Sequence, residues 1–588
     1  MSPADPRFPP IGAYGFLSDC HTSALVSYDG SVEWLCLPRF DSPSAFTALL
    51  DRGAGHFKLA PRGVVVPISR RYEPGTLVIE TTWVMDSGWL VTHDLLSIAE
   101  WVPGGDGSDG RPKTGHESDR SLLRLMTCVD GEVDIDMECL PRFGYGAMEA
   151  NWSGGELGEA TARGADGTEL LLTSDMELSL DGGAARGTLH LREDESGFCA
   201  ITWGEDAVGG PRSAPEALER LDSTEEFWRE WLRAGNFPDH PWRIHLQRSA
   251  LVLKGLTYTP TGAIVAAPTT SLPETPGGER NWDYRYSWIR DSTFSLWALH
   301  TLGFDQEARD FMRFILNVCK DDPDLQIMYG IGGERKLTES TLDHLGGYGG
   351  ASPVRIGNGA YDQRQNDVWG ALLDSIYLHF KALRGSGTQA DRQLIRHQVE
   401  AAIEAWPHPD QGIWESRGEP RHYVSSKLMI WVAVDRGVRL ARSFGFDEIA
   451  DEWQGKADEF HAEILERGVR DGVFRQHYDT DALDASLLLI PLLGFLAPND
   501  PRTRATVLAI ADELTENDMV LRYRVDQTDD GLAGEEGTFA ICSFWLVSAL
   551  VEIGEVTRAR DLCDKLLSYA SPLALYAEEI DPHSGRHL

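Results

Sequence analysis

Residues 277–303, GGERNWDYRYSWIRDSTFSLWALHTLG, place aromatic side chains beside charged ones at close spacing. Apolar residues recur at helical spacing only after Asp291, so a polar, aromatic loop leads into a helix. Aromatic rings can stack on the C–H face of a sugar, and carboxylate and guanidinium groups can bind its hydroxyls. Trp288, Arg290 and Asp291 are therefore candidate sugar-binding residues. The alternative is structural, with an acid in the first helical turn and tryptophans that fill a core.

A second acid lies in a Gly-rich segment, 406–423, within the sequence GIWESRGEP. Hydrolysis of a glycosidic bond needs two carboxyl groups, one protonated to assist the leaving oxygen and one ionised to activate water or attack carbon. Glu415 follows Trp414, and an apolar neighbour raises the pKa of a carboxyl group by desolvation. Glu415 is thus a candidate proton donor, although most glutamates are solvated surface charges.

Helical periodicity from residue 240 onward predicts a scaffold that could hold these loops. We expect helices near 241–257, 291–302, 305–320, 366–384, 388–405, 424–444, 446–466, 482–493, 500–514, 537–553 and 555–569. Their short connections predict antiparallel neighbours, and the long Gly-rich connections are where function is usually found. A toroid of six helical hairpins needs twelve helices, so the barrel is expected over 241–588 without its closing helix.

Residues 1–225 have the pattern of short β-strands. Turn sequences at 29–30, 86–88 and 130–131 separate alternating apolar runs and predict three hairpins. Several short strands at this spacing indicate an antiparallel β-sandwich. A helical linker is expected over 226–240.

Composition excludes several classes of function. A net charge of −38 argues against nucleic acid and against an anionic membrane surface. No apolar run is long enough to span a membrane, and the N-terminus lacks a basic segment followed by an apolar one. The eight cysteines are scattered, with no C-x-x-C, which predicts buried free thiols in a reducing compartment. We therefore expect a cytoplasmic protein, and its oligomeric state stays open.

Six long motifs resemble glycoside hydrolase family 15, the glucoamylase family, over nearly the whole chain. They are IGAYGFLSDCHTSALVSYDGSVEWLCLPRFDSPSAF, SLPETPGGERNWDYRYSWIRDSTFSLWAL, GNGAYDQRQNDVWGALLDS, GIWESRGEPRHYVSSK, GLAGEEGTFAICSFWLVSALVEIGE and LYAEEIDPHSGRHL. Within the family the chain is most similar to the trehalase branch of mycobacteria and related actinobacteria. The resemblance implies a multidomain fold, an N-terminal antiparallel β-sandwich followed by an (α/α)6 barrel. It also implies hydrolysis with inversion.

The resemblance also implies roles for individual residues. Glu415 matches the general acid, and Glu578, in A-E-E-I-D, matches the general base. Substrate-binding positions are Arg290, Asp291, Trp288, Tyr361, Gln365, Asp367, Trp414 and Arg417. Glu535 and Glu536, in GEEGTF, are rival candidates for the base, although a glutamate just before the helix expected at 537 could merely cap it.

Three functions remain open at this point. The first is hydrolysis of trehalose to two glucose molecules, and the second is exo-hydrolysis of malto- or isomalto-oligosaccharides. The third is sugar binding without catalysis. The presence of both candidate acids within their motifs argues against this third function. The expected partner is a small sugar. The two-carboxylate mechanism needs no cofactor, and we find neither a phosphate loop nor a metal-binding cluster. The resemblance implies phosphate and Mg²⁺ as activators.

Overall fold

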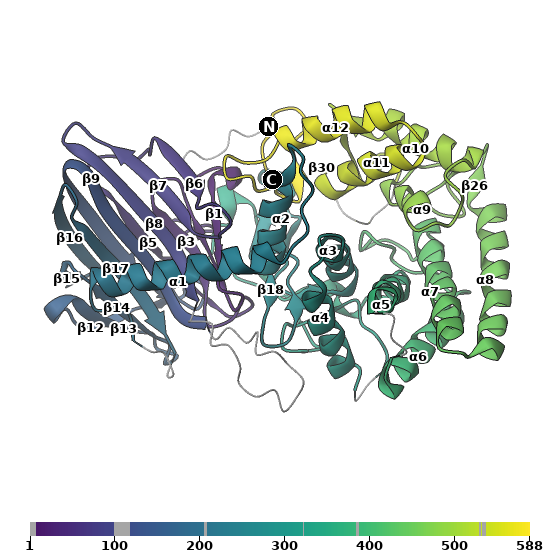
Figure 1. Ribbon diagram of the computed structural model, residues 1–588, viewed down its shortest axis with the longest axis horizontal. Coiled ribbons are helices and arrows are strands. Elements are labelled where there is room, and N and C mark those ends of the chain that lie inside the picture. The colour runs from purple at the N-terminus through teal and green to yellow at the C-terminus, as the bar shows by residue number, and fades with distance from the viewer. Residues whose placement is uncertain are drawn as a thin grey trace.

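A computed structural model describes residues 8–98, 118–204, 209–320, 323–383, 387–528, 531 and 537–588. The described chain has a β-sheet part and a helical part, which lie side by side (Figure 1). Helix α1 (Ala214–Arg233) runs along the sheet part and leads the chain to the helical part (Figure 1).

The sheet part is an antiparallel network of fifteen strands. They are β1 (Gly15–Ser18), β2 (Ser23–Val26), β3 (Ser31–Cys36), β4 (Ser44–Phe46), β5 (His56–Pro61), β6 (Ser69–Tyr72), β7 (Ile79–Val84), β8 (Gly88–Ile98), β9 (Ser118–Leu140), β12 (Asn151–Gly154), β13 (Glu159–Arg163), β14 (Glu169–Ser174), β15 (Glu177–Asp181), β16 (Ala184–Arg192) and β17 (Ser196–Trp203). The long strand β9 joins two layers, because its first half pairs with β17 and β8 and its second half with β5 and β16. Apolar side chains from both layers fill the core between them, as the sandwich prediction requires.

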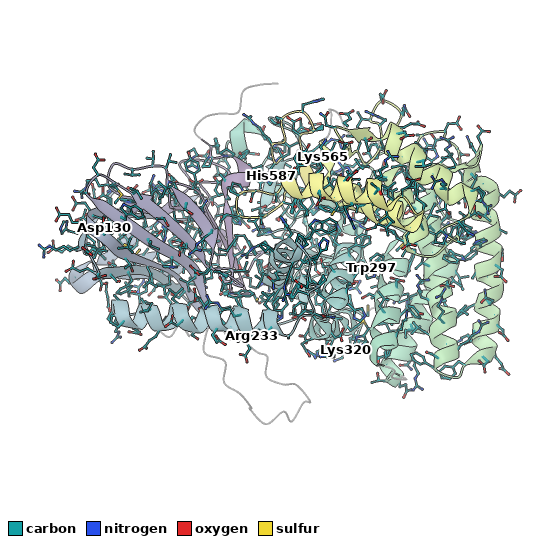
Figure 2. The ribbon with its side chains drawn as sticks, turned by 45° about the horizontal axis from the view of Figure 1, so that its top comes forward. Asp130, Arg233, Trp297, Lys320, Lys565 and His587 are labelled. Atoms are coloured by element: carbon teal, nitrogen blue, oxygen red, sulfur yellow. The ribbon has the colours of Figure 1, made fainter. Side chains whose placement is uncertain are left out.

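Two of the three predicted hairpins are confirmed, and the third is wrong. The turns at 29–30 and 86–88 join β2 to β3 and β7 to β8. At Asp130 and Gly131, however, β9 continues through a β-bulge opposite β8. Gly131 has φ +70°, and a Cβ there would lie 2.2 Å from the carbonyl oxygen of Ser87. The glycine therefore permits close approach to the neighbouring hairpin. Asp130 lies at the outer end of the sheet part (Figure 2).

Helix α1 begins earlier than the linker expected over 226–240. Ser213 accepts a hydrogen bond from the Glu216 amide and caps the helix, so α1 begins at Ala214, within the range assigned to the sandwich. Ala217 and Leu221 pack on apolar residues of the sheet. The first half of the helix thus belongs to the sheet part by its contacts.

The helical part contains eleven helices in the described residues, and each corresponds to one of the predicted ranges. They are α2 (Arg243–Gly255), α3 (Ile289–Thr301), α4 (Asp305–Val318), α5 (Val368–Leu383), α6 (Gln389–Ala405), α7 (Val424–Ser443), α8 (Asp447–Arg467), α9 (Leu489–Leu492), α10 (Pro501–Glu513), α11 (Ala540–Glu552) and α12 (Val556–Ser568). The range 482–493 forms only a 3-10 turn, Ala485–Leu488, and the short α9. Its length was overpredicted: Asp484 caps the 3-10 turn, and Leu493 lies just beyond α9.

Alternate helices form an inner ring and an outer layer. Helix α7 buries sixteen of its 20 residues, whereas α8 buries five of 21, so α7 lies inside and α8 outside. This inner ring continues through contacts of α3 with α5, of α5 with α7, of α7 with the 3-10 turn Ala485–Leu488 before α9, and of α9 with α11. Within the described chain, α11 lies next to α3 in this circle of helices. The aromatic side chains of Trp545 on α11 and Phe294 on α3 are in contact there, with their ring centroids 5.4 Å apart.

The last described residues fold back onto the helical part. Strand β31 (Glu579–Ile580) pairs with β30 (Thr538–Phe539), and a ring nitrogen of His587 lies 2.8 Å from the carbonyl oxygen of Tyr569, beside α12 (Figure 2). All eight cysteines are free and buried, which confirms the prediction of buried free thiols. None of the described helices combines the length and the apolar character that a bilayer crossing requires.

Candidate active site

The predicted site residues gather where the inner helices begin. Arg290 and Asp291 lie in the first turn of α3, and Asp367 immediately precedes α5. Glu415 lies in the connection that enters α7, and Glu578 lies beside the start of α11. Because alternate helices of the ring run in the same direction, these starts meet at one end of the barrel.

Arg290 links three of these segments. Its Nη1 donates to the side-chain oxygens of Gln365 at 3.0 Å and of Asp367 at 3.2 Å. Its Nη2 lies 3.5 Å from Asp291 and 3.7 Å from Glu415. A single guanidinium group thus connects the start of α3, the segment before α5 and the candidate acid, and it fixes their positions relative to one another.

Asp291 keeps an acceptor available. Its Oδ2 atom accepts no hydrogen bond, although the charge of Arg290 Nη2 lies 3.5 Å from it. A hydroxyl group that donates to this oxygen would add a hydrogen bond to a charged acceptor. Asp291 lines the same cavity as Glu415 and Glu578, which is where a sugar hydroxyl could supply that donor.

The connection that carries Glu415 is fastened at its base. The side chain of Asp410 accepts hydrogen bonds from the Asn366 amide at 2.8 Å and from the Ser426 hydroxyl at 2.7 Å, which ties it to the segment before α5 and to α7. Asp410 also pairs with Arg421 as an isolated antiparallel bridge, closing the loop. At its tip, Glu415 adopts φ +57°, a left-handed conformation that costs a non-glycine residue energy. The loop therefore presents Glu415 in one strained orientation.

The indole of Trp288 contacts the candidate acid directly. Its Nε1 donates to Glu415 Oε1 at 2.7 Å. Burial raises the pKa of Glu415, while the charge of Arg290 and the hydrogen bond from Trp288 lower it, and the net effect is a raised pKa. The predicted direction is confirmed. The expected partner differs, because the Trp414 indole instead donates to Asp484 at 2.9 Å.

Glu578 is held beside α11 by the main chain. The Ala540 amide donates to the Glu578 carbonyl oxygen at 2.9 Å, and the pairing of β30 with β31 continues that contact. Enclosure by the protein raises the pKa of Glu578, and the negative charge of Glu274 is the next cause; Arg522 and a hydrogen bond from Tyr284 act in the opposite direction. The side chain is exposed where it lines two cavities, and that exposure lessens the cost of charging it.

One cavity brings most of the predicted residues together. Its lining includes Trp288, Arg290, Asp291, Trp414, Glu415, Arg417 and Glu578. Gln365 and Asp367 act from behind it through Arg290. Tyr361 and Gln365 line a neighbouring cavity, so Tyr361 is not brought into the cavity that holds the two acids. Glu535 and Glu536 lie outside the described residues.

Several residues of the cavity wall were not predicted as site residues. They are Glu274, Arg280, Trp282, Tyr284 and Arg522. Trp282 and Tyr284 belong to the aromatic run of 277–303, which was a usable signal. The guanidinium carbon of Arg417 lies 4.3 Å from the centroid of the Trp282 ring. The two side chains therefore form a cation–π pair in the cavity wall. Glu274 and Arg522 pair across 248 positions of sequence, and no local pattern marks them.

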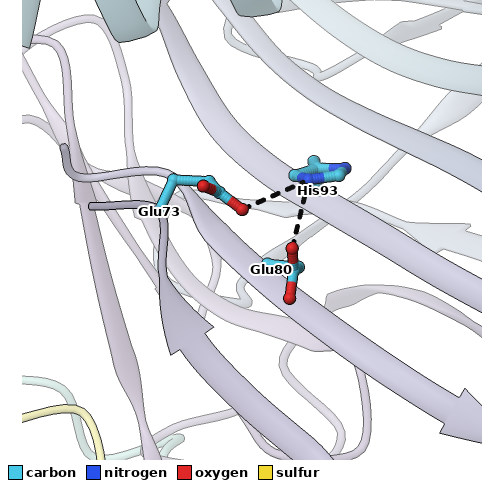
Figure 3. Close-up of side chains that lie close together, drawn as sticks. All are labelled: Glu73, Glu80 and His93. Atoms are coloured by element: carbon cyan, nitrogen blue, oxygen red, sulfur yellow. Dashed lines mark ion pairs between the residues drawn. The ribbon is translucent and has the colours of Figure 1, made fainter. Parts of the chain in front are cut away.

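A group in the sheet part has three potential metal-ligand atoms close together. The atoms of Glu73, Glu80 and His93 lie within 4.8 Å of one another (Figure 3). Arg71, however, already binds both carboxylate oxygens of Glu80, at 2.7 and 2.9 Å. An imidazole ligand also suits zinc or copper better than Mg²⁺, which prefers oxygen. This group therefore does not fit a magnesium site.

Comparisons with known proteins agree with the geometry. Residues 242–588 match the model of "Glycosyl hydrolases family 15", and residues 5–98 match "Trehalase-like, N-terminal". A protein named Trehalase from Mycolicibacterium smegmatis is 56% identical over 99% of this chain and 88% of its own length. Trehalase from Mycobacterium tuberculosis is 55% identical over 100% of this chain and 88% of its own length. Trehalase from Thermoplasma volcanium is 32% identical over 99% of this chain and 91% of its own.

A solved structure shares the overall fold. The crystal structure of a bacterial glucoamylase in complex with acarbose matches with a TM-score of 0.71 over 100% of this chain and 92% of the glucoamylase. Sequence identity is 12%, so this likeness concerns the fold: a β-sandwich followed by an (α/α)6 barrel.

Proposed function

The chain belongs to the glycosyl hydrolases of family 15, and from that premise we propose that it hydrolyses trehalose to two molecules of glucose with inversion. The observation that carries the proposal is the cavity in which two carboxyl groups with raised pKa, Glu415 and Glu578, accompany the Arg290–Asp291 pair. The relatives named Trehalase, which match almost the whole chain, support trehalose as the substrate.

The proposed reaction is a single displacement. Arg290 and Asp291 hold the hydroxyls of one glucose, with Trp288 beside its ring. Glu415 gives its proton to the glycosidic oxygen as the bond from that oxygen to the anomeric carbon breaks. Glu578 takes a proton from water, whose oxygen attacks the same carbon from the opposite face. The attacked glucose leaves as the β-anomer and the other glucose leaves as the α-anomer.

The two carboxyl groups divide the work by protonation. Catalysis requires Glu415 protonated and Glu578 ionised at the same time. Enclosure of Glu415 favours its protonated form, and the nearby charge of Arg290 keeps that group able to release the proton. The Tyr284 hydroxyl and the Arg522 charge favour the ionised form of Glu578.

One experiment tests substrate and stereochemistry together. Proton NMR should show equal amounts of β-glucose and α-glucose in the first minutes of trehalose hydrolysis, before mutarotation. Two α-glucose molecules would contradict inversion. Maltose and isomaltose are measured in parallel, and a higher kcat/KM on either would favour an exo-acting α-glucosidase over a trehalase. No hydrolysis of any α-glucoside would favour a sugar-binding protein. Glu415→Gln serves as the control for contaminating activity.

The cellular compartment and the cofactor requirement of the reaction are also proposals. We propose that it takes place in the cytoplasm, which the eight free thiols support because such thiols persist in a reducing compartment. We propose no cofactor for the displacement itself. Phosphate and Mg²⁺ remain predicted activators, and dialysis against EDTA and phosphate-free buffer, followed by separate addition of each ion, would test them.

A further inference from the structure

Glu274 is a buried acid that the two-carboxylate mechanism does not use. It directly follows β20 (Thr270–Pro273), is 7% exposed, and lines both the cavity of Glu415 and the second cavity that borders Glu578. Burying a carboxylate beside a catalytic one costs free energy. Its partners show what the charge does there.

Glu274 is fixed by three side chains of the wall. Trp282 Nε1 donates to its Oε1 at 3.1 Å, Arg522 Nη2 donates to its Oε2 at 3.1 Å, and Arg280 lies 3.9 Å away. The same Arg522 Nη2 lies 3.5 Å from Glu579, the residue after the candidate base. Arg522 is thus shared between Glu274 and Glu579, beside Glu578.

The charges around Glu578 come from every segment packed near it. They are Glu274, Arg280 and Tyr284 around the hairpin of β20 and β21 (Asn281–Asp283), Asp291 on α3, Arg522 after β29 (Met519–Val520) and Glu579 on β31. Arg290, Glu415 and Arg417 line the same cavity. Among these acids Glu274 raises the pKa of Glu578 most, and it hydrogen-bonds Arg522, whose charge acts in the opposite direction.

We propose that Glu274 is a positioning residue for the base: it anchors Arg522 in the wall that Glu578 lines and places a second negative charge there. This inference rests on the proposed function, because it assigns Glu274 to the base of that reaction. Removing the negative charge of Glu274 removes a repulsion and leaves the positive charge of Arg522 less neutralised beside Glu578. Both effects lower the pKa of Glu578.

The test isolates the base by removing the need for an acid. In a Glu415→Gln background, α-glucosyl fluoride needs little protonation of its leaving group, so kcat/KM rises with pH through the pKa of Glu578 alone. Adding Glu274→Gln should move that midpoint to lower pH by about 1 unit, the scale of a nearby charge. Glu274→Asp, which keeps the charge, should restore the midpoint.

The matched control is Glu279→Gln, which removes the same charge from an exposed position on the same connection. Its midpoint should stay in place. If the Glu274→Gln midpoint also stays in place, the proposal is wrong. A fall in kcat/KM by one factor at every pH would likewise overturn it, since this pattern means that Glu274 binds the sugar.

A second measurement does not depend on activity. Infrared difference titration of the wild-type protein against Glu578→Gln reports the protonated carboxyl of Glu578. The midpoint is compared between the wild type and Glu274→Gln, with Glu274→Asp as the control that keeps the charge. A lower midpoint in Glu274→Gln supports the proposal, and an unchanged midpoint overturns it. If Glu274→Gln fails to fold, a wild-type midpoint in the ordinary range near pH 4 still overturns the proposal. Wild-type protein that hydrolyses no α-glucoside would contradict the proposed function, and the comparison of infrared midpoints would still test the role of Glu274.

Discussion

The indole nitrogen of Trp288 donates a hydrogen bond of 2.7 Å to the carboxyl group of Glu415, across 127 positions of sequence. Trp288 ends β22 (Ser287–Trp288) and directly precedes α3, whose first turn carries Arg290 and Asp291. The short segment 288–291 therefore supplies both the residues proposed to bind the sugar hydroxyls and the hydrogen bond that orients Glu415. A donor to the carboxyl group favours its ionised form and opposes the effect of burial.

The pH dependence of the reaction follows from the two raised pKa values. Below both, Glu578 is protonated and no base is present; above both, Glu415 has lost its proton and no acid is present. The profile of kcat/KM for trehalose should therefore be bell-shaped, with both limbs above the ordinary glutamate pKa of about 4.3. A limb at or below that value would contradict the environments described for these carboxyl groups.

Trp288→Phe should shift one limb of that profile. The change keeps an aromatic ring and removes the donor, so the ionised form of Glu415 loses a hydrogen bond and its pKa rises. One limb should move to higher pH, and neither should move to lower pH. Trp297→Phe is the matched control, because this indole belongs to α3 but does not line the cavity. A profile of Trp288→Phe identical to that of the wild type would mean that the hydrogen bond has no effect on catalysis.

Asp291→Asn tests the grip on the sugar. The amide keeps the shape of the side chain, but it replaces a charged acceptor with a neutral group. We expect kcat/KM to fall by about 10- to 150-fold, the equivalent of roughly 1.5–3 kcal/mol for a hydrogen bond to a charged group. Circular dichroism should show an unchanged fold. Unchanged kinetics in a folded variant would remove Asp291 from the site.

Glu415→Gln should separate substrates by their leaving groups. Trehalose has a poor leaving group, so its hydrolysis should be abolished, whereas hydrolysis of α-glucosyl fluoride should be spared much more. Comparing kcat/KM of the variant and wild type on both substrates gives the result. An equal loss on the two would assign Glu415 a role other than proton donation.

The strained backbone at Glu415 predicts an unusual order of stability. At φ +57° a Cβ costs about 1–2 kcal/mol, so Glu415→Gly should be more stable than Glu415→Ala. Both variants lose the carboxyl group and its contact with Trp288, so their difference reports the backbone alone. Urea unfolding of the two measures it.

The control for this comparison is Glu419, an exposed residue of the same loop whose φ is not positive. There the order should reverse, because glycine costs more conformational entropy than alanine in an ordinary conformation. Glu415→Ala more stable than Glu415→Gly would contradict the strain.

The fold was predictable where one local pattern decides the structure. The helix over 424–444 was found because its apolar residues recur at helical spacing, and the structure places α7 there almost to the residue. Asp130 and Gly131 were misread because an Asp-Gly pair has the same local signature in a hairpin turn and in a bulge. The difference lies in the contact with Ser87 on a neighbouring hairpin, which no local pattern contains.

The site was predictable only in part for a similar reason. Glu415 and Asp291 stand in motifs whose residue types already indicate sugar chemistry. Glu274 and Arg522 have no such local pattern. They pair across 248 positions of sequence, and this contact exists only in the folded chain. Trp414 was assigned to the acid as its neighbour in sequence; it lines the same cavity, but its indole nitrogen donates to Asp484, and Trp288 supplies the hydrogen bond to Glu415.

Glu578→Ala tests the base against its rivals, Glu535 and Glu536. Loss of the base should lower kcat/KM by about 10²- to 10⁴-fold, the usual contribution of general base catalysis. The deletion leaves space beside the anomeric carbon, and azide needs no base to attack it. Sodium azide should therefore restore turnover of α-glucosyl fluoride, with β-glucosyl azide as the product seen by NMR. Neither Glu535→Ala nor Glu536→Ala should respond in this way. If azide rescues one of those two variants and not Glu578→Ala, the base has been assigned to the wrong residue.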